Sequence, residues 1–313
     1  MKERKSLTSK IDFAVVFKVK NANPNGDPLN GNRPRVAYDG IGEVTDVCVK
    51  RKIRDRLMEF LPKVKVSVDK KELELCPIFV QSDDNKADSY PNLKSRADAV
   101  LSAEASSKDK TIKACETWFD VRAFGQVFPF KPQNKGKGKG KEKGKADGAA
   151  GDDKGTSYGV RGPVTIQSAF SISSILNNVT SNQITKSTSL EGDGTQRKSD
   201  QMGMKHRVDR GTYVFFGSMN PQLAVKTGFN DDDAKAIKAV LPKLFENDES
   251  SARPAGSMRV LKVVWWQHNC PSGQCSSAKA HDSLKVTDTD DLDKLISFDD
   301  VKGGPKPEII DGV

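Results

Sequence analysis

The sequence predicts an α+β fold, and three observations support that prediction. Runs rich in Val, Ile and Phe have the length and composition of core strands at residues 11–20, 212–220 and 258–269. Two further stretches, at 45–61 and 229–245, have the features of helices. The chain has 313 residues, which is enough for one large domain or two small ones, with a core that needs neither disulfides nor a structural metal.

The first elements along the chain have the order strand, loop, helix. The apolar run 11–20 stops at NANPNGDPLNGNRPR (21–35), whose Asn, Pro and Gly residues favour an ordered loop. A helix is predicted over 45–61 because Thr45 or Asp46 can cap it, apolar residues recur at helical spacing, and a proline follows it.

The middle of the chain predicts insertions. Residues 63–116 mix short apolar runs with polar helical stretches, so we expect an insertion of mixed structure there. The aromatic-rich run 117–130 predicts a strand pair or a packed loop. Residues 134–155 hold seven Lys and seven Gly with almost no apolar side chain, which predicts a disordered or mobile loop.

The second half of the chain completes the order strand-helix-strand, then strand-helix-strand. Residues 159–176 predict a strand with alternating polar and apolar positions, and the polar stretch 177–206 predicts an extended hairpin arm. The second core strand, the second helix, whose first turn is acidic, and the third core strand follow. This order, with long insertions, is that of a ferredoxin-like or RNA-recognition-type fold.

The formal charge of +9 is unevenly distributed along the chain. Residues 276–313 form an acidic C-terminal segment with nine Asp and Glu against five Lys and Arg, so residues 1–275 carry +13. A basic body of this size favours a polyanionic partner, with nucleic acid first and an acidic membrane surface second.

Other features of the composition predict a cytoplasmic protein without a membrane span. No stretch approaches the roughly 18 consecutive apolar residues that a span needs. The charged start MKERKSLTSK lacks the pattern of a secretory signal. Five scattered cysteines do not form a disulfide framework.

Three basic groups are candidates for contacts with a polyanion. On the helix predicted over 45–61, Lys50, Arg51 and Arg54 share one flank, although an ordinary solvated helix face explains them equally well. In the loop, Arg33 and Arg35 could bind phosphate, or could be incidental to a turn. In the arm and at its end, basic residues surround two methionines, Met202 and Met204, that could wedge between bases. These basic residues are Arg197, Lys205, His206, Arg207 and Arg210.

Catalytic and metal-binding signals are weak, and we predict no metal and no cofactor. The zinc-ligating residue types near the third strand have a spacing that matches no closed site: His268, Cys270, Cys275 and His281. Asp27 and Asp46 could bind a metal for phosphodiester cleavage, but turn and cap roles explain them more simply. The phosphate-loop, nucleophile-elbow and zinc-protease motifs are missing from the sequence.

The run FAVVFKVKNANPNGDPLNGNRPR followed by GEVTDVCVKRKIRD, within residues 13–55, closely resembles the Csd-type backbone subunit of type I-C CRISPR Cascade. The resemblance continues at residues 160–175, at 203–221 and at WWQHN, so it covers most of the chain. The Lys-Gly tract departs from it.

The resemblance implies one domain over residues 1–313, with a modified RNA-recognition palm of the RAMP superfamily. It places a finger-like insertion at 63–158, including the Lys-Gly loop, and a thumb hairpin at 178–208. It implies a non-catalytic subunit that binds CRISPR RNA in an antiviral ribonucleoprotein and stacks head to tail with neighbouring copies in a helical filament. The guide bases would stay free to pair with a target DNA strand, and other Cascade subunits would be partners.

Residues matching the family's RNA cradle lie in the loop, on the first helix and after the Lys-Gly tract, and the arm residues given above complete the set. These predicted cradle residues are Asn21, Asn23, Asn25, Arg33, Arg35, Lys50, Arg51, Arg54, Arg161 and Gly162.

Two other functions remain open from the sequence. Related backbone subunits of type III systems cut RNA with an acidic loop residue, and Asp27 occupies that region here, although no second ligand is evident. A generic single-strand RNA chaperone would also be basic, but it would bind as a monomer with no fixed footprint.

Overall fold

The computed structural model describes residues 5–68, 71–104, 106–128, 158–186 and 201–313. Its centre is an 8-stranded antiparallel sheet with the main order β16-β13-β1-β12-β10-β4, and β9 and β11 also pair with β12. The protein is therefore a mixed α and β protein with one large sheet, as the sequence predicts. The strands of this sheet are β1 (Ile11–Ala22), β4 (Ile41–Val44), β9 (Val164–Ile166), β10 (Ala169–Ser174), β11 (Val179–Lys186), β12 (Gln201–Met219), β13 (Met258–Gln267) and β16 (Pro307–Asp311).

Strand β1 lies between β13 and β12 in the sheet, and apolar side chains cover both of its faces. Alternate residues, such as Phe13 and Phe17, lie in the main core, which they share with α1 (Asp46–Phe60) and α6 (Asp231–Val240). Ala14 and Val16 point to the opposite face and lie in two smaller apolar clusters. A strand buried on both sides has the continuous apolar character that residues 13–17 show.

Helix α1 forms where the sequence predicts it. Thr45 is the N-cap, and its Oγ1 accepts a hydrogen bond from the backbone N–H of Cys48. Val49, Ile53 and Leu57 form the buried stripe against the sheet. The helix ends at Phe60, just before Pro62.

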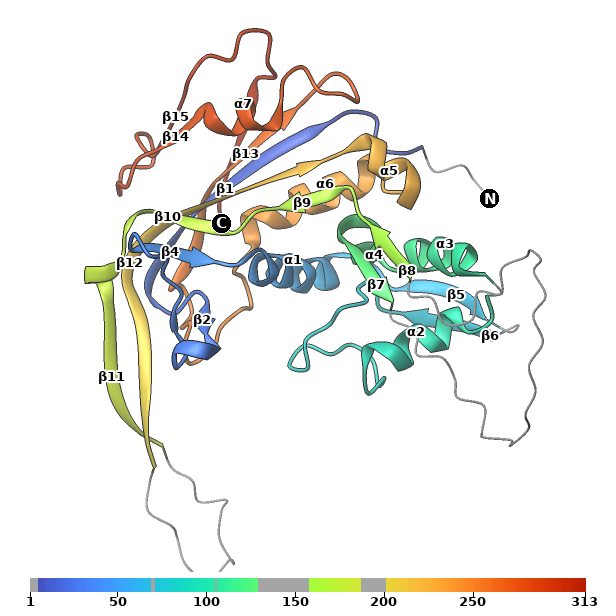
Figure 1. Cartoon of the computed structure of the whole chain (residues 1–313), viewed down its shortest axis with the longest axis horizontal. Helices are drawn as coiled ribbons and strands as arrows, with labels where there is room; N and C mark the ends of the chain where they lie inside the picture. Colours follow the sequence, from blue (N-terminus) through green and yellow to red (C-terminus); the bar gives the residue numbers. More distant parts are fainter. Residues whose placement is uncertain (1–4, 69–70, 105, 129–157, 187–200) are drawn as a thin grey trace, which may run out of the picture.

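The acidic C-terminal segment is folded, which sequence patterning does not reveal. It forms α7 (Ser277–Asp282), the hairpin β14 (Leu284–Val286) and β15 (Ile296–Phe298), and the edge strand β16. Ala280 and Leu284 of this segment pack together with Trp266 of β13. Helices α1 and α6 thus cover one face of the sheet, and the C-terminal segment covers the other (Figure 1).

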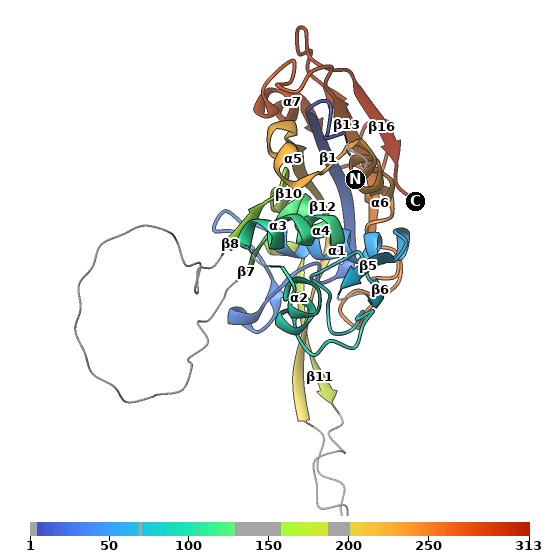
Figure 2. The ribbon, with the colours of Figure 1, turned by 90° about the vertical axis from the view of Figure 1, so that its right-hand side faces the viewer.

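A second, smaller core holds the middle of the chain together. It lies among β5 (Val64–Val68), β6 (Lys71–Leu75), α2 (Leu93–Leu101), α3 (Ser107–Thr117), α4 (Phe119–Phe124), β7 (Gly125–Phe128) and β8 (Tyr158–Arg161). Phe79 packs against Trp118 and Phe128 at its centre. We call this part, residues 63–128 and 158–161, the side unit; Figures 1 and 2 show it beside α1. The Lys-Gly tract 134–155 lies outside the described residues.

Four sequence predictions need correction at the level of single elements. Residues 117–130 contain the short helix α4 before β7, because Phe119 and Val121 bury opposite flanks of one helical turn in the two cores. Residues 159–176 form three strands, β8, β9 and β10, rather than one. The loop 21–35 contains two-residue strands, β2 (Gly26–Asp27) and β3 (Arg33–Pro34), around a 3₁₀ turn. The second helix begins at Asp231, after the separate helix α5 (Pro221–Thr227).

The predicted hairpin is an extension of a core strand. Strand β11 pairs antiparallel with the first part of β12, from Val179 opposite Val208 to Lys186 opposite Gln201. We call β11 and residues 201–208 the arm; it projects away from the sheet at the lower end of the molecule (Figure 1). Because β12 continues into the sheet as far as Met219, the arm is rooted in the core. No helix among the described residues is long and apolar enough to cross a membrane.

Candidate nucleic-acid interface

The asparagines of the loop after β1 hold the loop in shape. The Asn25 Oδ1 accepts hydrogen bonds from the backbone N–H and the hydroxyl of Thr45, both at 3.0 Å. The Asn23 side chain is buried, and its Nδ2 donates to the carbonyl of Asn32 at 2.6 Å. Asn21 differs, since it is exposed at the end of β1 with φ of +56°.

Asp27 and the two arginines of the loop have different surroundings. The Asp27 carboxylate caps the 3₁₀ turn by accepting from the N–H of Leu29 at 3.2 Å, and Arg35 lies 3.6 Å from it. Arg33 is exposed, and it has no ion pair within the part of the chain that the structure describes. Of this group, Arg33 is the cation available to a ligand.

One of the residues that could ligate a metal, His268, is engaged in other contacts. His268 accepts from the N–H of Gln274 at Nδ1, 2.9 Å away, so its Nε2 carries a proton and donates to Asp12 at 2.9 Å. In the described ranges no group of three or more His, Cys, Asp or Glu side chains could hold a metal ion.

The three cations predicted to share a free flank of α1 all have intramolecular partners. Lys50 lies 2.9 Å from Asp46, and Arg51 donates to the carbonyl of Val80 at 2.7 Å. Arg54 donates from Nε to Asp120 at 2.9 Å. Arg51 and Arg54 thus join α1 to the side unit, and contact of the three cations with RNA stays a prediction.

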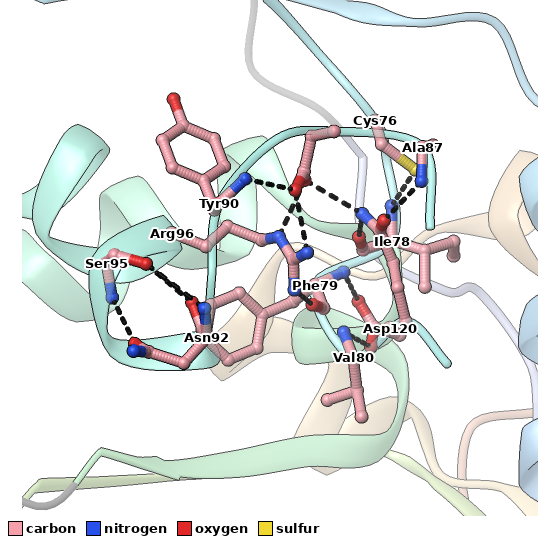
Figure 3. A network of polar contacts seen from close by, with 12 residues as sticks. Cys76, Ile78, Phe79, Val80, Ala87, Tyr90, Asn92, Ser95, Arg96 and Asp120 are labelled. Carbon is pink, nitrogen blue, oxygen red and sulfur yellow. Dashed lines mark hydrogen bonds and ion pairs between the residues drawn. The ribbon is translucent and has the colours of Figure 1, made fainter. Parts of the chain in front are cut away.

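Asp120 is the centre of this junction. Its carboxylate accepts from the backbone N–H groups of Phe79 and Val80 at 2.7 and 3.0 Å, as Figure 3 shows. Arg96 donates to the carbonyl of Phe79 at 2.7 Å and pairs with Asp88. Burial alone would raise the pKa of Asp88, but the hydrogen bonds and charge of Arg96 outweigh it and lower that pKa. The network fixes the orientation of the side unit on α1.

Arg161 and Gly162 have separate roles. Arg161 is exposed at the end of β8, and no ion pair holds it within the described residues. Gly162 is buried, and a Cβ there would lie 2.2 Å from the carbonyl oxygen of Ala123. Gly162 therefore allows β8 and α4 to pack closely, whereas Arg161 is free to contact a ligand.

The arm presents some of its predicted residues and buries one. Met202 and Met204 are 66% and 53% exposed, and Lys205 is exposed beside them. His206 is only 7% exposed, and its Nδ1 lies 2.7 Å from the hydroxyl of Ser181. Contact of His206 with RNA stays a prediction. Arg207 donates to Asp209 at 2.9 Å. Arg197 lies outside the described residues.

The strongest basic group on the sheet lies at the root of the arm, and the sequence prediction included only one of its members. In the strand register Lys20 is opposite Arg210, and Lys18 is opposite Arg259. Lys18 and Lys20 share a face because side chains alternate along a strand. We call Lys18, Lys20, Arg210 and Arg259 the root patch. The alternation in the sequence KVK at residues 18–20 was the available signal, but the pairing of β1 with β12 and β13 could not be derived from it.

The fold brings several predicted groups to one end of the molecule. The short strand β3 of the loop lies against β12. The first part of β12 belongs to the arm, and its second part lies in the centre of the sheet. Asn21 and the root patch lie at the base of the arm, where β1 ends, β13 begins and β12 continues from the arm into the sheet. Helix α5 is at the far end of the molecule from the arm in both views (Figures 1 and 2).

A family model and one relative name the same family. A family model described as CRISPR-associated protein Cas7 matches residues 9–303. A protein of Haloferax volcanii named CRISPR-associated protein Cas7 is 24% identical over 261 residues, covering 82% of this chain and 69% of that protein. Two solved structures are also similar to parts of the chain. One, from a CRISPR RNA-guided surveillance complex, pre-nicking, has a TM-score of 0.44 and 15% identity and covers 82% of this chain and 78% of its own. The other, from a CRISPR RNA-guided surveillance complex, has a TM-score of 0.39 and 13% identity and covers 91% and 79%. Since the family model spans nearly the whole described fold, the chain belongs to the CRISPR-associated protein Cas7 family.

Proposed function

We propose that this protein is a non-catalytic CRISPR RNA-binding backbone subunit of a type I-C Cascade complex. The observation that carries the proposal is the root patch beside an arm that presents Met202 and Met204. Cations contact phosphates whatever the base sequence, and apolar side chains can separate neighbouring bases. A subunit that holds a variable guide needs these properties.

The parts of the structure have proposed roles in this assembly. The large sheet with α1 and α6 is an RNA-recognition-type palm, the finger-like insertion at 63–158 includes most of the side unit, and the arm is the thumb predicted at 178–208. Head-to-tail contacts between copies would not close on themselves, so the RNA would set the length of the filament. Target DNA would pair with the exposed guide bases, and other Cascade subunits would complete the complex.

The proposed RNA contacts follow from exposure and from strand register. Arg33, Arg161, Lys205 and Arg210 keep the role predicted for them, and Lys18, Lys20 and Arg259 are added to it. Asn23, Asn25, Arg54, Gly162 and His206 support the surface through packing and hydrogen bonds instead. Cleavage by Asp27 is the weaker proposal, since its carboxylate already caps a turn and faces Arg35.

Purification of the full-length chain and sequencing of the RNA bound to it test the proposal. We expect CRISPR RNA that stays intact during incubation with magnesium. The double variant K20Q/R259Q should retain less RNA than K226Q/K243Q, which removes the same charge from exposed lysines outside the root patch. Random cellular RNA, cleavage in magnesium, or equal retention by the two variants would count against it.

A further inference from the structure

The loop between β14 and β15 lies on the root patch. This loop, residues 287–295, belongs to the acidic C-terminal segment and carries Asp288 and Asp290. Asp290 accepts a hydrogen bond from Lys18 and lies 3.1 Å from the Arg210 guanidinium. Asp288 accepts from the hydroxyl of Thr212 at 2.7 Å and from that of Ser173 at 3.4 Å. Two carboxylates therefore bind three strands of the sheet, at the base of the arm.

The root patch needs a counter-charge. Cations directly opposite each other on adjacent strands repel, and here two rows of cations share one face. Among the described residues, neither Lys20 nor Arg259 has an ion pair of its own. The hydrogen bond and charge of Lys18, together with the charges of Arg210 and Arg259, lower the pKa of Asp290, so its carboxylate stays ionised.

The loop is anchored by contacts that do not involve its carboxylates. Leu295 is fully buried against Val16 and Leu261, and the N–H of Thr287 donates to the carbonyl of Leu295 at 2.8 Å. The Asp290 side chain, by contrast, is 68% exposed. The carboxylates can therefore leave the patch while the hairpin keeps its place on the sheet.

We propose that Lys18, Arg210 and Thr212 form a binding site for backbone phosphates of RNA, and that Asp288 and Asp290 occupy this site in the free protein. A carboxylate and a phosphate oxygen accept the same hydrogen bonds from Lys, Arg and hydroxyl groups. RNA displaces the two carboxylates, and the acidic loop thereby weakens binding to any RNA that cannot compete with it. This inference rests on the proposed function and adds a site and a competitor to it.

Fluorescence titration of the full-length protein with a labelled oligouridine tests the proposal. The variant D288N/D290N is compared with D293N/D300N, which removes the same charge from exposed positions of the same segment that do not touch the patch. D288N/D290N should bind about three- to tenfold more tightly, because the ion pairs of Asp290 with Lys18 and Arg210 no longer compete. The slope of the logarithm of its binding constant against the logarithm of salt concentration should become steeper by about 0.7 for each additional phosphate that the protein neutralises.

Two further measurements make the outcome decisive. Adding K18Q/R210Q to D288N/D290N should abolish the increase in affinity, and thermal melting of each variant checks its fold. In the wild-type protein, amide hydrogen exchange at 287–295 should become faster when oligouridine is added. Equal affinities for D288N/D290N and D293N/D300N, or slower exchange in the loop, would overturn the inference alone. If neither the wild type nor D288N/D290N binds oligouridine or CRISPR RNA, the proposed function itself fails.

Discussion

The guanidinium of Arg54 donates from Nε to the carboxylate of Asp120 at 2.9 Å, and the two side chains are only 11% and 1% exposed. This contact joins α1, which packs on the sheet, to α4 in the side unit. Arg54, a residue type that can bind RNA, is therefore a structural link between the two parts.

Replacing Arg54 with Met should lower the free energy of unfolding by about 3 kcal/mol or more, because Asp120 would remain buried without its cation. Replacing Lys50, whose pair with Asp46 is partly solvated, should cost less than about 1 kcal/mol. Guanidinium denaturation measures both. Similar losses for R54M and K50M would show that the Arg54 contact is not a structural link.

Gly162 should tolerate no side chain. In G162A the new Cβ would meet the carbonyl oxygen of Ala123 at 2.2 Å, and backbone must move to relieve it. We expect a loss of about 1–3 kcal/mol in stability. The matched variant G159A, in the adjoining strand with no atom within 4 Å of the added Cβ, should change little. Thermal melting compares the two, and an unchanged melting temperature for G162A would contradict a packing role.

Acidification should destabilise the C-terminal segment through His281. Burial lowers the pKa of its imidazole below the ordinary value of 6.5, and Asp12 only partly opposes this, with Lys10 and Asp282 also nearby. The unfolded chain therefore takes up a proton more readily than the folded one as the pH falls through 6.5. The free energy of unfolding should decrease between about pH 7.5 and 5.5, and less steeply in H281Q. Denaturant titrations at both pH values measure this change in the wild type and in H281Q. An equal dependence of the free energy of unfolding on pH in the two proteins would refute the assignment.

The exposed methionines of the arm should matter for RNA and not for folding. In M202A/M204A the melting temperature should stay the same within error, since both side chains are mostly exposed. If they separate bases, the periodic reactivity of guide nucleotides to a chemical probe should disappear in this variant. V225A, which trims an equally exposed apolar residue on α5, should keep the period. Retention of the period in M202A/M204A would exclude a wedge role.

Local signals in the sequence were sufficient for much of the fold. The Thr45 cap and the apolar stripe Val49, Ile53 and Leu57 are local signals that define α1, and apart from Asp12 the first half of β1 is apolar. The acidic C-terminal segment, in contrast, folds because Leu284 and Leu295 reach apolar side chains of β1 and β13. Contacts of that kind are set by the packed sheet and leave no period in the sequence.

The site was predictable in type but not in every member. Clustered cations near the arm indicated an anion-binding surface, and Arg210 belongs to it. Lys18 and Arg259 belong to this surface only because the strand register places them opposite each other. Arg54 does not belong to it, because it binds Asp120, a partner 66 residues away that local sequence patterns do not reveal. Charge patterns identify candidates, and tertiary pairing decides which of them stay free.

Native mass spectrometry of the protein assembled on CRISPR RNAs of several lengths tests the central proposal most directly. A backbone subunit should add whole copies in proportion to RNA length, and each complex should contain one RNA. K20Q/R259Q should reduce the number of copies bound, whereas K226Q/K243Q should not. A single copy on every RNA, whatever its length, would contradict the account.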